Sequence, residues 1–196
     1  MNMGDLNSGD QLLKLGDAYA TAISQYFKDV DVLFGPAYKG IPLACAAAMQ
    51  YKVRFGGKAP KYCADRKEAK DHGDVGTLLG AKLKPGDRIV IVEDVTTSGK
   101  SISEVVPKIK AAQPEAQIVG LVVSFDRLER GTSPNKTALE EIAELYGIET
   151  HAVVSIKDVL RVQASRGLLT KKIAICFRDY YSKYGVEGVD VIPTPC

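Results

Sequence analysis

Short apolar runs alternate with segments of helical periodicity along most of this chain. The runs are 31–35 (DVLFG), 89–92 (IVIV), 117–125 (QIVGLVVSF) and 149–156 (ETHAVVSI), and 61–66 (KYCADR) adds a less apolar one. They are apolar at successive positions rather than at every second position, which is typical of strands buried on both faces. The alternation therefore predicts an α/β fold in which helices flank both faces of a parallel sheet.

The segments between these runs have the apolar spacing of amphipathic helices. They are residues 10–27, 40–53, 101–113 and 138–147, and the tail 157–184 is also expected to be helical. Asp10 is the expected N-terminal cap of the first helix. Pro107 is expected to kink or restart the third, because proline lacks the amide that a helix needs. Residues 67–80 hold three glycines and mixed charges without a clear period, so we predict a long mobile loop there.

The length of 196 residues suffices for one domain, and we expect residues 1–196 to form a single one. A net charge of +2 gives little reason to expect nucleic acid as a partner. A membrane span is not expected, since no apolar run approaches about 18 residues. A secretory leader is not expected either, since the start MNMGDLNSGD shows neither a basic region nor an apolar one. The cysteines are far apart in sequence, so we expect reduced thiols, with Cys45 and Cys63 buried, in a cytoplasmic protein.

The stretch IVIVEDVTTSGKS (89–101) joins an apolar run to the third expected helix. It ends like a nucleotide-binding P-loop, but Asp94 stands where such a loop needs glycine, behind Glu93. The hydroxyls and small residues from Thr96 to Ser101 can hold a phosphate at a helix start, whereas two carboxylates would repel a triphosphate. Carboxylates also accept hydrogen bonds from vicinal ribose hydroxyls. The stretch therefore favours a phosphorylated ribose over the alternative interpretation, a solvated turn.

Residues 92–99 (VEDVTTSG) resemble the phosphoribosyl pyrophosphate motif of the type I phosphoribosyltransferases. Three further stretches resemble one branch of that family, the orotate phosphoribosyltransferases: FGPAYKGIP (34–42), RKEAKDHG (66–73) and SFDRLERG (124–131). The resemblance runs from about residue 2 to residue 160. It implies transfer of phosphoribosyl from phosphoribosyl pyrophosphate to orotate, which gives orotidine 5′-phosphate and pyrophosphate in UMP synthesis. It also implies Mg²⁺ as the cofactor.

The resemblance assigns a set of residues to phosphoribosyl pyrophosphate. They are Tyr38, Lys39, Arg66, Lys67, Lys70, His72, Glu93, Asp94, Val95, Thr96, Thr97, Ser98, Gly99, Lys100 and Ser101. Lys70, His72 and Asp94 are the expected catalytic residues, and the cations among them would stabilise the negative charge that builds on the departing pyrophosphate. The resemblance implies that substrate holds most of the magnesium shell, with Glu93 and Asp94 reaching the ion through water.

The basic stretch 66–73 has two interpretations. Taken alone, such a charge run is more often a solvated loop. The resemblance instead implies a homodimer in which loop 66–80 closes over the neighbouring subunit's active site and excludes water. It also assigns orotate to Thr97 and Arg127, because a planar carboxylate suits a guanidinium.

Other charged residues are given structural or surface roles. Arg130 is expected at the surface or in a salt bridge, and His151, which lies in an apolar run, is expected to be structural. The acids expected to be solvated surface are Glu129, Glu140, Glu141 and Glu144.

Members of the family carry some tens of residues before the stretch that residues 2–9 match, including aromatic residues that pack over orotate. We therefore expect a truncated N-terminal hood here, and a chain that binds phosphoribosyl pyrophosphate but turns over orotate poorly.

Two other functional classes stay open, a ligand-sensing regulator without catalysis and a purine phosphoribosyltransferase. The cation set 66–72 disfavours the first, and Arg127 disfavours the second. Asp94 disfavours a P-loop NTPase.

Overall fold

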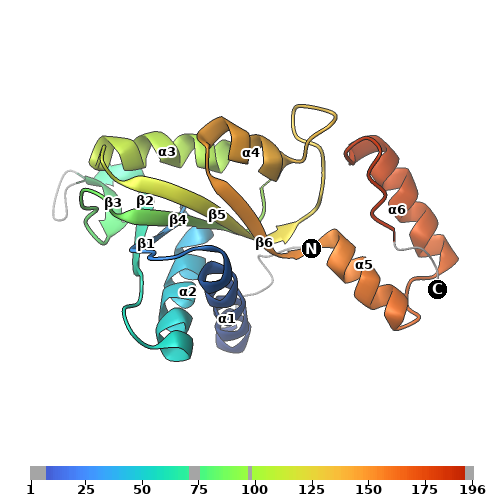
Figure 1. Ribbon diagram of the computed structural model, residues 1–196, viewed down its shortest axis with the longest axis horizontal. Coiled ribbons are helices and arrows are strands. Elements are labelled where there is room, and N and C mark those ends of the chain that lie inside the picture. Colours follow the sequence, from blue (N-terminus) through green and yellow to red (C-terminus); the bar gives the residue numbers. More distant parts are fainter. Residues whose placement is uncertain (1–7, 71–75, 97–98, 193–196) are drawn as a thin grey trace.

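The computed structural model describes residues 8–70, 76–96 and 99–192, and its centre is a six-stranded sheet (Figure 1). The strands are β1 (Val32–Gly35), β2 (Lys61–Lys70), β3 (Gly76–Gly80), β4 (Arg88–Glu93), β5 (Gln117–Asp126) and β6 (Glu149–Ser155). They lie in the order β3-β2-β1-β4-β5-β6. Every neighbouring pair is parallel except β2 and β3, which are antiparallel. The α/β prediction is confirmed, with one antiparallel edge strand added.

The edge strand β3 corrects the prediction of a long loop over 67–80. Residues 67–70 complete β2, and 76–80 form β3 against it. Leu78 pairs with Asp65 in this hairpin and packs against the core. That tertiary contact fixes a strand where the charge-rich sequence showed no period. Residues 71–75 lie outside the described ranges.

Helices cover the sheet on both faces (Figure 1). Helices α1 (Gly9–Tyr26) and α2 (Gly40–Phe55) lie on one face, and α3 (Lys100–Ala112) and α4 (Ala138–Tyr146) lie on the other. Side chains alternate along β4: Ile89 and Ile91 pack in the α3–α4 layer, whereas Val90 and Val92 pack in the α1–α2 layer. Because both faces are apolar, the run IVIV reads as continuously hydrophobic.

Two helix details differ from the sequence predictions. The cap of α1 is Ser8 instead of Asp10: the Ser8 hydroxyl accepts the Gln11 amide at 3.3 Å, and the Gln11 side chain accepts the Ser8 amide at 3.1 Å. This reciprocal pair is a capping box. Helix α3 runs unbroken through Pro107, so the expected restart is wrong. The proline forfeits one backbone hydrogen bond, which the packed helix tolerates.

The C-terminal region forms a small cluster beyond β6 (Figure 1). Helix α5 (Ile156–Ser165) and helix α6 (Lys171–Tyr184) divide the predicted helical tail in two, with Gly167 at a φ of 68° in the turn between them. Val191 and Ile192, close to the end of the described chain, are buried against Phe125 and the two helices. The end of β5 thus contacts the last part of the chain.

The cysteines in the described ranges are free thiols. Cys63 is buried as expected, but Cys45 is only half-buried, and Cys176 is exposed. Within the same ranges, none of the helices combines the length and the apolar character needed to cross a membrane.

Helices α1 and α2 are in close contact at Gly16. A Cβ there would lie 2.7 Å from the Ala46 carbonyl oxygen, whereas a Cβ at Gly9 of the same helix meets no heavy atom within 4 Å. We expect Gly16→Ala to lower the free energy of unfolding by roughly 1–3 kcal/mol through overpacking. Gly9→Ala, the matched control, should be neutral or slightly stabilising. Urea denaturation followed by circular dichroism measures both, and equal stability of the two variants would contradict the prediction.

Candidate active site

The chain reverses its direction of travel across the sheet between β1 and β4. From β1 it passes through α2 to β2 on one side, and from β4 it passes through α3 to β5 on the other. In open parallel sheets such a reversal leaves a crevice at the carboxyl ends of the two strands. Lys39 follows β1 and Asp94 follows β4, and the Lys39 ammonium lies 3.1 Å from an Asp94 carboxylate oxygen. The structure therefore brings two of the predicted site residues together in this crevice.

The loop after β1 is folded tightly against the end of β4. A Cβ on Gly40 would lie 2.9 Å from the Val92 carbonyl oxygen, and one on Gly35 would lie 2.1 Å from the Gly40 oxygen. Only glycine allows this approach of backbone to backbone. Tyr38, by contrast, is 72% exposed and faces solvent. The loop thus presents polar side chains outward from a closely packed backbone.

Glu93 is turned into the protein. It is buried, its carboxylate accepts the Asp94 amide at 2.9 Å, and the Tyr19 hydroxyl donates to its carbonyl oxygen. Burial raises the pKa of Glu93 from its usual 4.5 to about 7, although hydrogen bonds from the Asp94 amide and Ser101 oppose the shift. Near neutral pH both the protonated and the ionised form of this carboxyl group are therefore populated.

Asp94 is the more accessible of the two acids. Its side chain is 15% exposed, and it accepts the Val95 amide at 2.7 Å on one oxygen and Lys39 on the other. Its carbonyl oxygen accepts the Ser124 amide at 3.0 Å and the Ser124 hydroxyl, which joins it to β5. The Asp94 carboxylate is thus fixed by hydrogen bonds and lies beside a cation at the mouth of the crevice.

Helix α3 begins directly after this segment. Gly99 is its N-cap at a φ of 65°, and the Gly99 amide donates to the Thr96 hydroxyl at 3.1 Å. Val95, Thr96 and Ser101 are half-buried, and Lys100 is exposed. Thr97 and Ser98 lie outside the described residues. A helix start with small residues beside it is suited to an anionic group.

Of the cations predicted in 66–73, the two whose side chains the structure describes, Arg66 and Lys67, do not reach the acids. Arg66 donates to the Leu78 carbonyl oxygen at 3.4 Å inside the hairpin, and Lys67 pairs with Glu104 of α3 at 3.3 Å. The side chain of Lys70 and all of His72 lie outside what the structure describes. Lys39 is the predicted cation that the structure brings to Asp94.

Arg127 follows β5 and lies in a polar network with α6. Its guanidinium is 3.3 Å from Glu129, the Tyr180 hydroxyl donates to Glu129, and the Tyr181 hydroxyl donates to the Arg127 carbonyl oxygen. Glu129 is only 15% exposed, which corrects its assignment to solvated surface. These residues border a cavity of about 590 Å³. The rest of its lining is Phe125, Ile156, Val159, Cys176 and Phe177.

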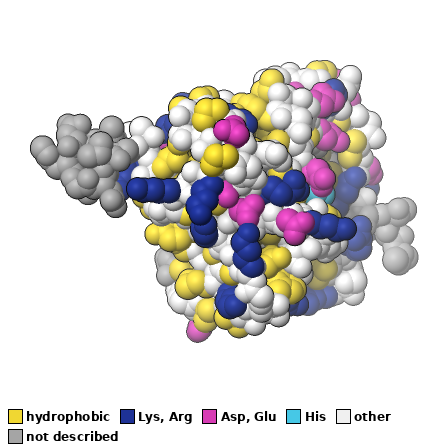
Figure 2. All heavy atoms as spheres, turned by 60° about the vertical axis from the view of Figure 1, so that its left-hand side comes forward, with side chains coloured by type: hydrophobic (Ala, Val, Ile, Leu, Met, Phe, Trp, Pro, Cys, Tyr) yellow, Lys and Arg dark blue, Asp and Glu magenta, His cyan; other side chains and the backbone are white. Residues whose placement is uncertain are grey.

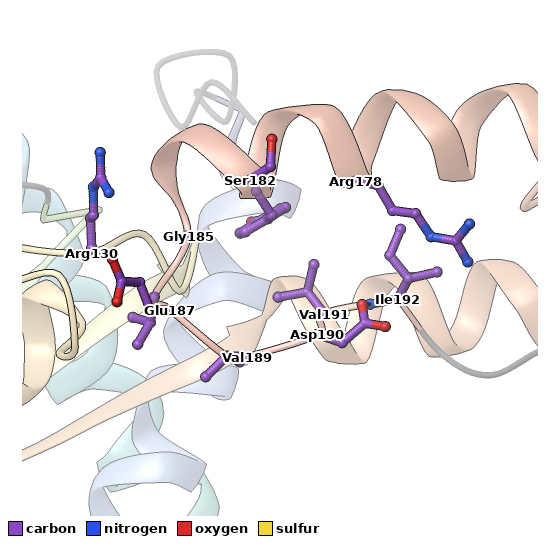
Figure 3. Close-up of a pocket in the computed structure, with 12 residues that line it drawn as sticks. Arg130, Arg178, Ser182, Gly185, Glu187, Val189, Asp190, Val191 and Ile192 are labelled. Atoms are coloured by element: carbon purple, nitrogen blue, oxygen red, sulfur yellow. Dashed lines mark hydrogen bonds between the residues drawn. The ribbon is translucent and has the colours of Figure 1, made fainter.

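A second cavity, of about 500 Å³, lies between α6 and residues 185–192 (Figure 3). Arg130 and Glu187 stand at one end of it, and Arg178 and Asp190 stand at the other. Arg130 therefore belongs to this C-terminal cavity instead of the crevice. Neither of these two cavities includes Glu93 or Asp94 in its lining.

Glu140 and Glu144 are exposed as expected and Glu141 is half-buried, and all three also hold local structure. Glu140 completes a capping box with Thr137, and Glu141 accepts the Thr132 amide at 2.9 Å and the amide of Ser133. Glu144 pairs with Lys136 on an exposed face. His151 stacks on Tyr26 with ring centroids 3.7 Å apart.

Sequence reasoning missed Tyr19, Ser124 and Asp65, which support the crevice from inside. The first two donate to the backbone of Glu93 and Asp94. Asp65 is 1% exposed, accepts the Ala37 amide at 2.7 Å and pairs with Lys108 of α3. Asp65 could have been found from the strand pattern: it stands two positions after Cys63, and residues two positions apart on a strand share a face, so it faces the core as Cys63 does.

Charges of both signs share the visible surface. On the face shown in Figure 2, Lys and Arg side chains lie interspersed with Asp and Glu, with hydrophobic patches around them. This distribution accords with the small net charge of +2.

Residues 5–157 match the model of the family described as "Phosphoribosyl transferase domain". Over 194 residues the chain is 50% identical to orotate phosphoribosyltransferase of Lachnoclostridium phytofermentans, covering 96% of this chain and 85% of that protein. It is also 50% identical to the orotate phosphoribosyltransferase of Agathobacter rectalis, with 95% of this chain and 85% of that protein covered.

Solved structures agree with these sequence matches. The crystal structure of Francisella tularensis orotate phosphoribosyltransferase superposes with a TM-score of 0.80 at 31% identity, covering 94% of this chain and 85% of that one. A Mycobacterium tuberculosis orotate phosphoribosyltransferase in complex with phosphoribosyl pyrophosphate superposes with a TM-score of 0.58 at 19% identity, covering 81% of each chain. At that identity the likeness shows the fold alone.

The raised pKa of Glu93 predicts how stability depends on pH. Between pH 4.5 and about 7 the folded state holds a proton on Glu93 that the unfolded chain has released, so this group's contribution falls as pH rises. We expect Glu93→Gln to abolish that fall, which amounts to about 2–3 kcal/mol of unfolding free energy. Urea titrations at pH 5 and pH 8 measure it. Glu115→Gln at an exposed turn is the control and should keep the parental pH dependence.

Proposed function

This chain belongs to the phosphoribosyl transferase domain family, in its orotate phosphoribosyltransferase branch, and on that basis we propose where its reaction takes place in the fold. The enzyme transfers phosphoribosyl to orotate in pyrimidine synthesis. We place phosphoribosyl pyrophosphate in the crevice between β1 and β4. The observation that carries this proposal is the Lys39–Asp94 contact of 3.1 Å at the point where the strand order reverses.

The two acids have different tasks in this proposal. Asp94 accepts hydrogen bonds from the ribose hydroxyls, because its carboxylate is accessible and already held by the Val95 amide. Glu93 supports it from below, since its own carboxyl group is buried against the Asp94 amide. When substrate binds, Lys39 exchanges its contact with Asp94 for a pyrophosphate oxygen. Tyr38 and Lys39 then form the wall that faces the leaving group.

The segment after the acids receives the 5′-phosphate. Its members are Val95, Thr96, Thr97, Ser98, Gly99, Lys100 and Ser101. Helix α3 begins at Lys100 within this segment, and a helix N-terminus favours negative charge. Glycine suits this cap because its φ of 65° is left-handed and a Cβ there would lie 3.1 Å from the Ile142 side chain.

The residues of the crevice fit a magnesium ion held mainly by substrate. Among the described residues, groups of three or more His, Cys, Asp or Glu side chains suited to a metal ion are absent, and Asp94 is the accessible carboxylate in the crevice. Magnesium is commonly bound through one or two carboxylates together with substrate phosphates and water. When bound, the ion would supply positive charge to the departing pyrophosphate.

Further cations act on the leaving group from the 66–80 segment. Lys67 would exchange Glu104 for pyrophosphate, and Arg66, Lys70 and His72 would add to the positive field. Exclusion of water by this segment would limit hydrolysis of the reactive sugar. The proposal includes a homodimer in which each subunit's segment serves the other's crevice.

Orotate is proposed to bind beside Arg127 and Thr97. Strands β4 and β5 are parallel neighbours, with Glu93 opposite Val123, so their carboxyl ends open on the same edge of the sheet. Arg127 is 41% exposed and bonded to Glu129, whose place the orotate carboxylate would take. The proposal treats residues 1–196 as one cytoplasmic domain, in keeping with the free, buried thiol of Cys63.

Release of pyrophosphate with different bases tests the substrate assignment. We expect magnesium-dependent release with orotate, and none above background with adenine, xanthine or uracil. Chelation of magnesium with EDTA should abolish it. Arg127→Ala should raise KM for orotate at least ten-fold through loss of a charged hydrogen bond, whereas Arg130→Ala, the control in the second cavity, should leave it within two-fold. Release with a purine, or equal effects of the two arginine variants, would refute this assignment.

Mixed subunits test the shared active site. Assayed well below the parental KM for orotate, Lys70→Ala chains and Arg127→Ala chains should each have little activity. A mixed dimer combines an intact segment from one chain with an intact orotate site on the other, so activity should rise to about a quarter of the parental value in an equal mixture. Steady-state rates before and after co-refolding measure it. If every mixture stays at the level of the single variants, the segment serves its own subunit.

A further inference from the structure

Asp65 is a buried carboxylate with both oxygens occupied. It lies on β2, on the same side as Cys63, which belongs to the core beneath α3. One oxygen accepts the Ala37 amide at 2.7 Å, and the other accepts the Lys108 ammonium of α3. The side chain is only 1% exposed, whereas that of Lys108 is 30% exposed. Asp65 therefore joins the loop after β1, strand β2 and helix α3 at one point.

A simple attachment of β2 to α3 does not require a buried acid. Lys67 and Glu104 already link the same two elements at the surface, one strand pleat and one helical turn away. Burying a carboxylate is costly unless it is fully hydrogen-bonded, and an apolar pair of similar volume often serves equally well between two elements. What an apolar residue cannot supply is an acceptor for the Ala37 amide.

The Ala37 amide is the donor that anchors the start of the 36–40 loop. Pro36 has no amide hydrogen, and the loop is closed at its other end by the Gly40 amide donating to the Pro36 carbonyl at 2.9 Å. The bond to Asp65 ties the loop to the neighbouring strand, just before Tyr38 and Lys39. The position of the Lys39 backbone, and hence its reach to Asp94, depends on that anchor.

We propose that Asp65 is a positioning residue for the pyrophosphate side of the crevice: it fixes the 36–40 loop through the Ala37 amide, while Lys108 neutralises its charge in the core. This inference rests on the proposed binding of pyrophosphate by Tyr38 and Lys39. The role proposed for Asp65 concerns only the binding of phosphoribosyl pyrophosphate. Orotate recognition at Arg127, which follows β5, three strands away from β2, does not depend on Asp65.

A matched pair of double variants separates the acceptor from the ion pair. Asp65→Leu with Lys108→Met removes both charges and leaves an apolar pair of similar size. Asp65→Asn with Lys108→Met also removes both charges, but the amide oxygen of Asn can still accept from Ala37. The probe is inorganic pyrophosphate as a product inhibitor competing with phosphoribosyl pyrophosphate. KM for each substrate, kcat and the melting temperature are measured alongside.

We expect the Leu/Met variant to weaken pyrophosphate inhibition and raise KM for phosphoribosyl pyrophosphate roughly ten-fold or more, with KM for orotate within two-fold. The Asn/Met variant should stay within about three-fold of the parent on every parameter. If both double variants bind pyrophosphate as the parent does, or both lose orotate and pyrophosphate affinity in parallel with melting temperature, Asp65 is a core residue only and the proposal is wrong.

Lys39→Ala distinguishes failure of this inference from failure of the function beneath it. Weaker pyrophosphate inhibition in Lys39→Ala, together with unchanged inhibition in the Leu/Met variant, would overturn the role of Asp65 and leave the pyrophosphate site in place. Unchanged inhibition in Lys39→Ala would remove the pyrophosphate site itself, and the positioning role with it.

Discussion

The divergence of the chain from two adjacent parallel strands is the constraint on which the rest of this structure depends. Strands β1 and β4 lie side by side, but their following helices turn to opposite faces and opposite sides of the sheet. Backbone therefore cannot fill the space above their carboxyl ends. The 36–40 loop and residues 93–96 border that space, and the Lys39 ammonium and the Asp94 carboxylate meet across it at 3.1 Å. Continuous apolar strands and helices on both faces make this geometry rigid.

The acids around the crevice differ in how far they are exposed to solvent. Asp65 and Glu93 are buried, and each is satisfied internally, the first by an amide and an ammonium group and the second by an amide. Asp94 is the acid left accessible. The buried acids hold backbone in place, so the accessible one stands on a fixed support. Preorganisation of this kind lets a site stabilise charge without rearranging when the reaction occurs.

Much of this arrangement follows from the sequence, because its strongest signals are local or periodic. The helices at 40–53 and 138–147, the strand IVIV and the paired acids could all be located from spacing and residue type. The misplaced features depend on partners distant in sequence. Strand β3 is fixed by pairing with β2, and Glu129 is drawn inward by Tyr180 of α6. Asp65 meets Lys108 43 positions away, which no local pattern reveals. The cap at Ser8 was a local signal, a Ser followed three positions later by Gln, and could have been found.

The attachment of α6 to the segment after β5 bears on the order in which the enzyme matures on the ribosome. The Tyr181 hydroxyl closes on the Arg127 carbonyl oxygen across 54 positions of chain, whereas the backbone of Asp94 is held by Ser124, only 30 positions away. A nascent chain emerges from its N-terminus and can fold as it appears. The hydrogen bonds that hold the two acids can consequently form while translation continues, whereas the proposed orotate site gains its contacts with α6 only after that helix has left the exit tunnel.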